Sequence, residues 1–370
     1  MMKNQWSLIA ACSLLSLQPL NAFFWNKTDD ASKKTEPRAS DNAMMADPLS
    51  HGHYQLKNAC NITFTGSALY WKAYEEGLDY AIKSDAGITN VRDGSVKRME
   101  FGWDWGFRAG LGYQIPNDKM DLSAVWTCYE SRGTDSTHAS FPSTLFSVWS
   151  YPGAGLSSET QAKAKARLKL NMVDLVMGAT FTPRRFLDIK PFIGLTSAWI
   201  DQKMDIHLSG GSSTQIVNAT VLDDHITLHN DFWGIGPKVG INTLWVLGWG
   251  FSIVGNADVS VYYGIFDLRQ DEAVSLLGIT PDNTYSDIDR NRQHLLRTNL
   301  DLMIGMRWDI LFNRDRCHLG FEAGWENILL SGQNQLMRFV TPGTGNPGIN
   351  VSGKGDLCLQ GLTLKGSFSF

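Results

Sequence analysis

The sequence predicts an all-β fold, a transmembrane antiparallel β-barrel of about 10 strands, with 12 to 16 strands as the alternative. Three observations support this prediction. Apolar and polar side chains alternate from Ile62 onward, the connections between alternating segments are short and long in turn, and Asp356–Phe370 forms one more alternating segment. Because successive side chains of a strand point to opposite faces, this pattern indicates a wall with one apolar side and one polar side.

The segment Asp356–Phe370 shows the alternation clearly. Leu362, Leu364, Phe368 and Phe370 fall on one face, and polar side chains fall on the other. Such a strand can pair with the first strand and leave no unpaired edge in lipid. Phe368 and Phe370 also resemble the barrel-assembly signal of bacterial outer-membrane barrels. An ordinary strand of a soluble β-sandwich is the alternative.

The first part of the chain has the features of an export signal. Residues 1–22 combine Lys3, an apolar stretch and a small-residue cleavage site, so we expect a signal peptide that is removed. A lipoprotein processing site at Cys12 is the alternative. Residues 23–58 are polar and lack a period, which predicts a flexible periplasmic extension, and residues 59–370 are expected to form the barrel. No later stretch is long and apolar enough for a transmembrane helix.

Ten strands are expected from the alternation. They cover residues 61–73, 98–115, 119–131, 165–181, 189–208, 226–243, 248–269, 293–310, 317–330 and 356–370. Two of these segments fit poorly, since 189–208 lacks clean alternation and 165–181 exchanges its apolar face near Met172, which indicates either a bulge or the membrane boundary. The alternating lengths of the connections match short periplasmic turns and long extracellular loops.

Aromatic side chains near the strand ends are expected to form girdles at the membrane–water boundaries. The candidates are Tyr70, Trp71, Tyr113, Trp126, Tyr129, Trp199, Trp233, Trp245, Trp308 and Trp325. Aromatic packing in a soluble β core is the alternative.

Charged residues on the polar faces of the strands are the candidates for lining a pore. The positive ones are Arg108, Lys238, Arg297, Arg307 and Lys365, and the negative ones are Asp104, Asp258, Asp301, Asp309, Glu322 and Glu326. Their charges nearly cancel, which predicts weak ion preference or an internal salt-bridge network. The alternative is that they only keep the interior hydrated and paired. If they line a pore, Arg297→Ala and Arg307→Ala should move its conductance toward cation preference.

Several motifs resemble a known family, the major outer membrane proteins of Legionella and their relatives in chlamydia-like bacteria. The matching segments are Ala68–Trp71, Glu76–Ala81, Trp103–Arg108, Gly110–Tyr113, Pro191–Leu195, Ala198–Gln202, Asn230–Lys238, Gly324–Glu326, Gln333–Leu336, Gly355–Leu357 and Gln360–Leu364. The resemblance implies an abundant, pore-forming barrel of the outer membrane. Ten strands, however, give a lumen largely filled by side chains, whereas open aqueous pores typically have about 16 to 18 strands.

The expected function is that of a porin-like barrel for passive, weakly selective diffusion of small hydrophilic solutes and ions. The alternative is a structural envelope protein or adhesin that acts through surface loops and disulfide cross-links. Cys60, Cys128, Cys317 and Cys358 are the disulfide candidates, and they lack the close paired spacing of zinc sites, so no metal is expected. The resemblance to envelope proteins of chlamydia-like bacteria also favours bridges between neighbouring molecules.

The expected partners are outer-membrane lipid, the barrel-assembly machinery, small hydrophilic solutes, and a second copy or disulfide-linked neighbours. A net charge of -4 without a basic run argues against nucleic acid. No cofactor or catalytic residue is expected, and the sequence is not predicted to be an enzyme. The alternative is a His–Asp site formed by Asp223-Asp224-His225 with His229 and Asp231, near an expected extracellular strand end.

Overall fold

The computed structural model describes residues 60–85, 94–116, 119–150, 156–213, 220–276, 283–313, 316–340, 349–352 and 355–370. All of them belong to the compact unit Asp47–Phe370. The expected signal peptide and extension, residues 1–58, lie outside the described residues. Within the described ranges there is no helix of the length and apolar character needed to cross a membrane.

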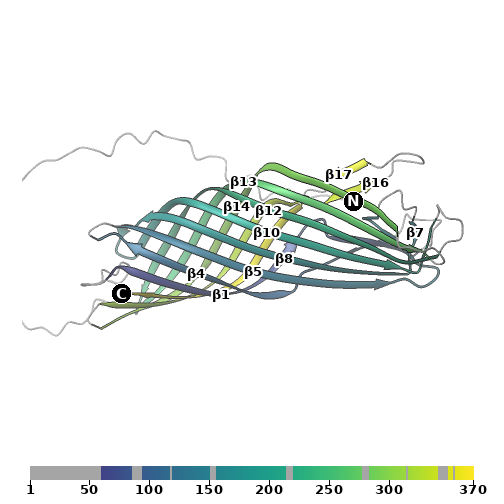
Figure 1. The fold of residues 1–370 in the computed structure, drawn as a ribbon. Helices are drawn as coiled ribbons and strands as arrows, with labels where there is room; N and C mark the ends of the chain where they lie inside the picture. The colour runs from purple at the N-terminus through teal and green to yellow at the C-terminus, as the bar shows by residue number, and fades with distance from the viewer. Residues whose placement is uncertain are drawn as a thin grey trace, which may run out of the picture. The chain divides into compact units, whose positions relative to one another are not determined.

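Ten antiparallel strands close into a barrel, so the predicted architecture and strand number are confirmed (Figure 1). Around the barrel they follow in the order β1 (Ile62–Glu75), β4 (Trp103–Gln114), β5 (Met120–His138), β8 (Gln161–Ala179), β10 (Leu187–Ser209), β12 (Thr220–Gly248), β13 (Phe251–Leu276), β14 (Asn283–Phe312), β15 (Cys317–Asn334) and β18 (Gly355–Ser369). Each expected strand corresponds to one of these. The largest difference is length, because β12, β13 and β14 have 29, 26 and 30 residues whereas β4 has 12.

The first and last strands join to complete the barrel. The backbone N–H groups of Ile62 and Phe370 donate to each other's carbonyl oxygens at 3.3 and 3.1 Å, and β1 pairs with β18 without interruption from Thr63 to Glu75. The hairpin between β12 and β13 turns at the same end of the barrel, through Trp249 and Gly250. Both residues have positive φ, at 57° and 82°, as a two-residue type I′ turn requires. Short turns mark this end as the periplasmic one.

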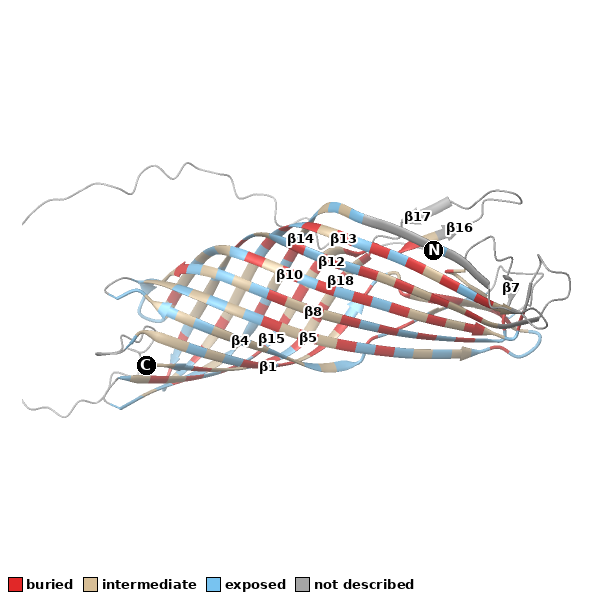
Figure 2. Ribbon diagram, viewed as in Figure 1, coloured by how far each residue is buried: buried red, intermediate tan, exposed pale blue. Residues whose placement is uncertain are grey.

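Strand β8 shows how the outer face is organised (Figure 2). Its outward positions nearer the periplasmic end are Val173, Leu175 and Met177, all exposed, as expected for contact with lipid. Farther along the strand the outward positions become charged, and apolar side chains such as Leu168 and Leu170 are buried inside.

The exchange of the apolar face near Met172 is therefore the membrane boundary and not a bulge. The pairing of β8 with β5 runs without a register shift from Ala179 to Gln161. In strand β10 the apolar side chains likewise move from the outer face to the inner face after Trp199. This explains why its alternation looked irregular in the sequence. Beyond the lipid, water surrounds the barrel and the apolar side chains turn inward.

Most of the aromatic residues predicted to form girdles face outward, but two of the candidates do not. Trp126, Trp199 and Trp325 are exposed on the outer face. Trp71 and Tyr129, in contrast, are each 1% exposed and face the barrel interior. The Tyr129 hydroxyl donates to the backbone oxygen of Trp71 at 2.9 Å, so both rings belong to an internal core.

Shorter strands lie at the ends of the barrel strands. One three-stranded sheet joins β2 (Asp79–Ser84), β3 (Gly94–Arg98) and β6 (Thr144–Ser147), and a hairpin joins β16 (Met337–Val340) and β17 (Ile349–Ser352). Three more strands extend the main sheet, namely β7 (Leu156–Ser158), β9 (Phe181–Arg184) and β11 (Gly211–Ser213).

Candidate functional site: a charged cavity in the lumen

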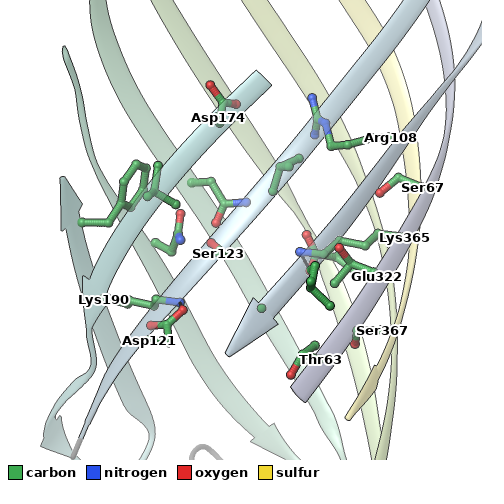
Figure 3. Close-up of a pocket in the computed structure, with 18 of the residues that line it drawn as sticks. Thr63, Ser67, Arg108, Asp121, Ser123, Asp174, Lys190, Glu322, Lys365 and Ser367 are labelled. Carbon is green, nitrogen blue, oxygen red and sulfur yellow. Dashed lines mark hydrogen bonds and ion pairs between the residues drawn. The ribbon is translucent and has the colours of Figure 1, made fainter. Parts of the chain in front are cut away.

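A cavity of about 460 Å³ occupies the periplasmic half of the barrel interior. Asn61, Gln114, Lys119 and Thr180, close to the periplasmic ends of their strands, line its entrance. Figure 3 shows its polar wall, in which Thr63 and Ser367 lie well apart from Asp174 and Arg108. The wall is polar because alternate residues of each strand face away from lipid.

Six charged side chains from six strands form the inner end of this cavity, and we call them the charge ring. They are Arg108 of β4, Asp174 of β8, Lys238 of β12, Asp258 of β13, Asp301 of β14 and Glu326 of β15. The barrel brings them together although they are far apart in the sequence.

Arg108 and Glu326 form a pair with two hydrogen bonds. The Arg108 Nη2 and Nη1 atoms donate to the two carboxylate oxygens of Glu326 at 2.8 and 3.3 Å. Thr363 Oγ1 donates to Glu326 at 2.6 Å, and Arg108 Nε donates to Thr127 Oγ1 at 2.9 Å. The pair is thus held in place by hydroxyl groups on both sides.

Lys238 bridges two other carboxylates of the ring. Its Nζ atom lies 3.3 Å from Asp174 Oδ2 and 3.1 Å from Asp258 Oδ1. Asp301 interacts electrostatically with Asp258 and Glu326 as well as with the two cations of the ring. Four carboxyl groups of the ring therefore share two permanent positive charges.

The charges nearer the periplasmic entrance have the opposite balance. Lys190 Nζ contacts Asp121 Oδ2 at 2.5 Å, and Lys365 Nζ lies 3.6 Å from Glu322 Oε2. With Lys119 and Arg307 also in the wall, four basic side chains stand beside two acidic ones here. The complete lining is balanced, with six basic and six acidic side chains, but the two signs are separated by depth.

Beyond the charge ring, side chains fill the interior. The fully or almost fully buried ones come from all around the barrel: Leu69, Trp71, Tyr129, Leu168, Leu170, Ile200, Phe232, Tyr262, Phe266, Ile328 and Leu359. Their polar atoms are satisfied, since Trp71 Nε1 donates to Thr363 Oγ1 at 3.1 Å and the Tyr262 hydroxyl lies 3.1 Å from Thr196 Oγ1. We call this region the packed layer. It is the filled lumen that ten strands lead one to expect.

Polar contacts at the extracellular end of the barrel surround Trp149. Its Nε1 donates to the Asp79 backbone oxygen at 2.6 Å, and the guanidinium of Arg338 lies 4.7 Å from the ring centroid. Gln270 Nε2 donates to the Trp149 backbone oxygen at 3.1 Å, which ties this residue to β13.

Most of the predicted pore-lining residues lie in the cavity wall. These are Arg108, Lys238, Asp258, Asp301, Arg307, Glu322, Glu326 and Lys365. The other three lie elsewhere: Asp104 accepts from Ser131 Oγ at 2.7 Å, Asp309 lies behind the wall against Arg307 and His318, and Arg297 stacks over Phe266.

Sequence reasoning missed Asp174, Asp121 and Lys190. Asp174 belongs to the strand whose apolar face changes sides, so its inward orientation could be recognised only once Val173 and Leu175 were taken as lipid-facing. Asp121 and Lys190 lie close to turns, where the alternation gives little information.

The cysteine and histidine candidates do not form sites in the barrel interior. Cys60, Cys128, Cys317 and Cys358 are free thiols, so no disulfide joins any two of them. His225 stacks on His207 at 4.0 Å and lies 3.7 Å from Asp205, all on the outer face. Asp224 instead points inward and accepts from Ser150 Oγ at 2.9 Å, so the expected His–Asp cluster is divided between the two faces. Within the described ranges, no group of three His, Cys, Asp or Glu side chains could hold a metal ion.

The comparison with protein families decides the family. The family described as Legionella pneumophila major outer membrane protein precursor matches residues 55–370. The chain belongs to this family. Members of the family are outer-membrane proteins, and the closed barrel agrees with that location, so the protein is one of the bacterial outer membrane. The resemblance stated from the sequence motifs is confirmed. No curated protein matches the chain.

Solved structures with a similar arrangement are outer-membrane proteins. The outer membrane protease OmpT from Escherichia coli is 11% identical, with 86% of this chain and 99% of that chain covered and a TM-score of 0.40. A major outer membrane protein from Thermus thermophilus is 10% identical, with 84% and 99% covered and a TM-score of 0.27. CarO from Acinetobacter baumannii is 13% identical, with 60% and 84% covered and a TM-score of 0.22. Likenesses this distant carry no argument about activity.

Proposed function

We propose that this outer-membrane barrel passes small ions and other small hydrophilic solutes passively through its lumen, and that the charge ring gives the passage a preference for cations. The observation behind the proposal is the ring itself. Charged side chains at membrane depth are costly unless they face water or one another, and in membrane proteins they often mark an ion pathway. Four carboxyl groups around two permanent cations at the inner end of a cavity favour the entry of cations over that of anions.

The packed layer limits such a passage. Solutes would cross it only when its side chains move apart, so we expect small and infrequent conductance steps. The proposal keeps the porin-like function expected from the sequence but replaces weak selectivity with cation selectivity, because the basic and acidic side chains lie at different depths.

Planar-bilayer recording with the refolded chain tests this proposal. A salt gradient should give a reversal potential of the cation-selective sign. Asp174→Asn should lower the cation-to-anion permeability ratio about tenfold, since one charge at about 6 Å from an ion in water contributes about 0.7 kcal/mol, which a cation loses and an anion gains on its removal. The matched control is Asp267→Asn, which removes the same charge from an exposed outward position of β13 and should leave the ratio unchanged.

A structural role in the envelope is the second candidate function, and the packed layer favours it. A barrel that never conducts would still present its extracellular strands and free thiols to neighbouring molecules. If the bilayer recordings show no steps, and whole envelopes give higher-order bands that collapse with reductant, the envelope role replaces the passage role.

A further inference from the structure

The outer face of β8 carries a row of basic side chains. Lys163, Lys165, Arg167 and Lys169 occupy successive outward positions, and the alanine and leucine residues between them are buried inside. At about 3.3 Å per residue, the row extends about 20 Å along the strand. Consecutive members lie about 7 Å apart along the strand, so two or three of them can contact one polyanionic group together.

The row begins where the lipid-facing surface of the same strand ends. The outward positions before it are Met177, Leu175 and Val173, followed by Asn171. Asn171 pairs with the exposed Trp199 of β10. Exposed tryptophan at this height indicates the membrane–water boundary, so Lys169 lies at the level of the lipid headgroups.

The neighbouring strands add to the positive charge. Arg132 of β5 and Lys203 of β10 face outward beside the row, with Glu130, Asp201 and Asp205 as the acidic neighbours. Six basic side chains therefore stand beside three acidic ones. Glu130 Oε1 already forms ion pairs with Arg132 Nη2 at 2.7 Å and with Arg167 Nη2 at 2.9 Å. Among the described residues, Lys163, Lys165 and Lys169 have no ion-pair partner.

Another part of the outer wall shows that this charge is local. On β12 and β13, the outward positions beyond the lipid include Asp223, Asp231, Asp267 and Asp271 beside one arginine, Arg269. A surface that is basic all round the barrel would only increase solubility. A basic face confined to β5, β8 and β10 can instead bind an anion at one defined place.

We propose that this basic face binds the phosphorylated headgroup of a lipid of the outer leaflet. The exposed aliphatic positions of β8 would contact the acyl chains of the same lipid, and the lysines would bind its phosphate groups. The site does not depend on the proposed passage of ions, because it lies on the opposite side of the barrel wall from the cavity.

Binding of diphosphoryl lipid A to the refolded chain in detergent micelles tests the proposal. Lys165→Gln with Lys169→Gln should weaken binding about thirtyfold, since each lysine near an anionic lipid surface contributes about 1 kcal/mol. The control, Lys83→Gln with Lys97→Gln, removes the same charge from β2 and β3 and should leave binding unchanged. Lys165→Arg with Lys169→Arg retains the charge and should retain binding.

Two further probes identify the ligand. Phosphatidylcholine, which has no net charge, should bind at least tenfold more weakly than diphosphoryl lipid A. Inorganic phosphate should compete only weakly, because it lacks acyl chains. Equal loss in the test and control variants, or full binding by the double glutamine variant when its mobility on unheated gels shows a folded barrel, would overturn the proposal.

Discussion

Replacing Arg108 with methionine should destabilise the barrel strongly. The substitution keeps a long side chain beside Trp71 but removes both hydrogen bonds to Glu326, whose side chain is 2% exposed. A buried carboxylate that loses its partner costs about 3 to 5 kcal/mol. Because Arg108 is 21% exposed to the cavity, water can replace part of the interaction, and we expect a loss near the lower end, about 3 kcal/mol.

Urea unfolding of the barrel in lipid vesicles, followed by tryptophan fluorescence, measures this loss. The control is Arg132→Met, which breaks a pair at 2.7 Å between an arginine that is 71% exposed and a glutamate that is 36% exposed, and it should cost less than about 1 kcal/mol. Adding Glu326→Gln to Arg108→Met should recover at least half of the loss, because the carboxylate then no longer needs a partner. If Arg108→Met costs no more than Arg132→Met, the ring pair does not stabilise the barrel as argued.

Three more predictions concern the core, the extracellular end and barrel closure. Trp71→Ala should cost about 3 to 5 kcal/mol and enlarge the conductance steps, because the ring is 1% exposed in the packed layer; unchanged steps would show that solutes do not pass there. Burial, with a smaller effect of Asp224, raises the pKa of Glu159 to about 8. The folded state therefore holds this proton more tightly than the unfolded chain, so the stability it contributes is complete below about pH 4.5 and is lost as the pH rises through about 8. Proteolysis of the extracellular loops should accelerate over that range, and Glu159→Gln should abolish the dependence. Phe370 stacks on Phe64 at 6.1 Å, so Phe370→Ser with Phe368→Ser should reduce the fraction of chain that reaches a folded, heat-modifiable state in the outer membrane, whereas Ser367→Ala should not.

The fold could be predicted from the sequence because lipid imposes a simple rule on the outer face. Over the membrane-spanning part, every second residue must be apolar. The exposed apolar residues of β14 and β18, such as Trp308 and Phe368, follow this rule. The same rule fails for residues 161–172 of β8, where water lies outside and the apolar core lies inside. Alternation shows that the two faces of a strand lie in different environments, but it does not show which face is on the outside of the barrel.

The cavity could be predicted only in part. The inward face of a strand follows from its pattern, so Arg108, Asp301 and Glu326 could be chosen in advance. Their contacts depend on the stagger between neighbouring strands, which no single segment encodes. For this reason the separation of positive and negative side chains by depth, and the contact of Lys238 with both Asp174 and Asp258, emerged only from the structure.

The unequal strand lengths determine how far the barrel wall extends beyond the bilayer. A strand of 30 residues at about 3.3 Å per residue and a tilt of about 40° rises about 75 Å, whereas the apolar band of a barrel is about 25 Å tall. Much of β12, β13 and β14 therefore stands clear of the bilayer as a rigid wall. Molecules that approach the cell surface would contact this wall of paired strands, whose shape does not depend on loop conformation.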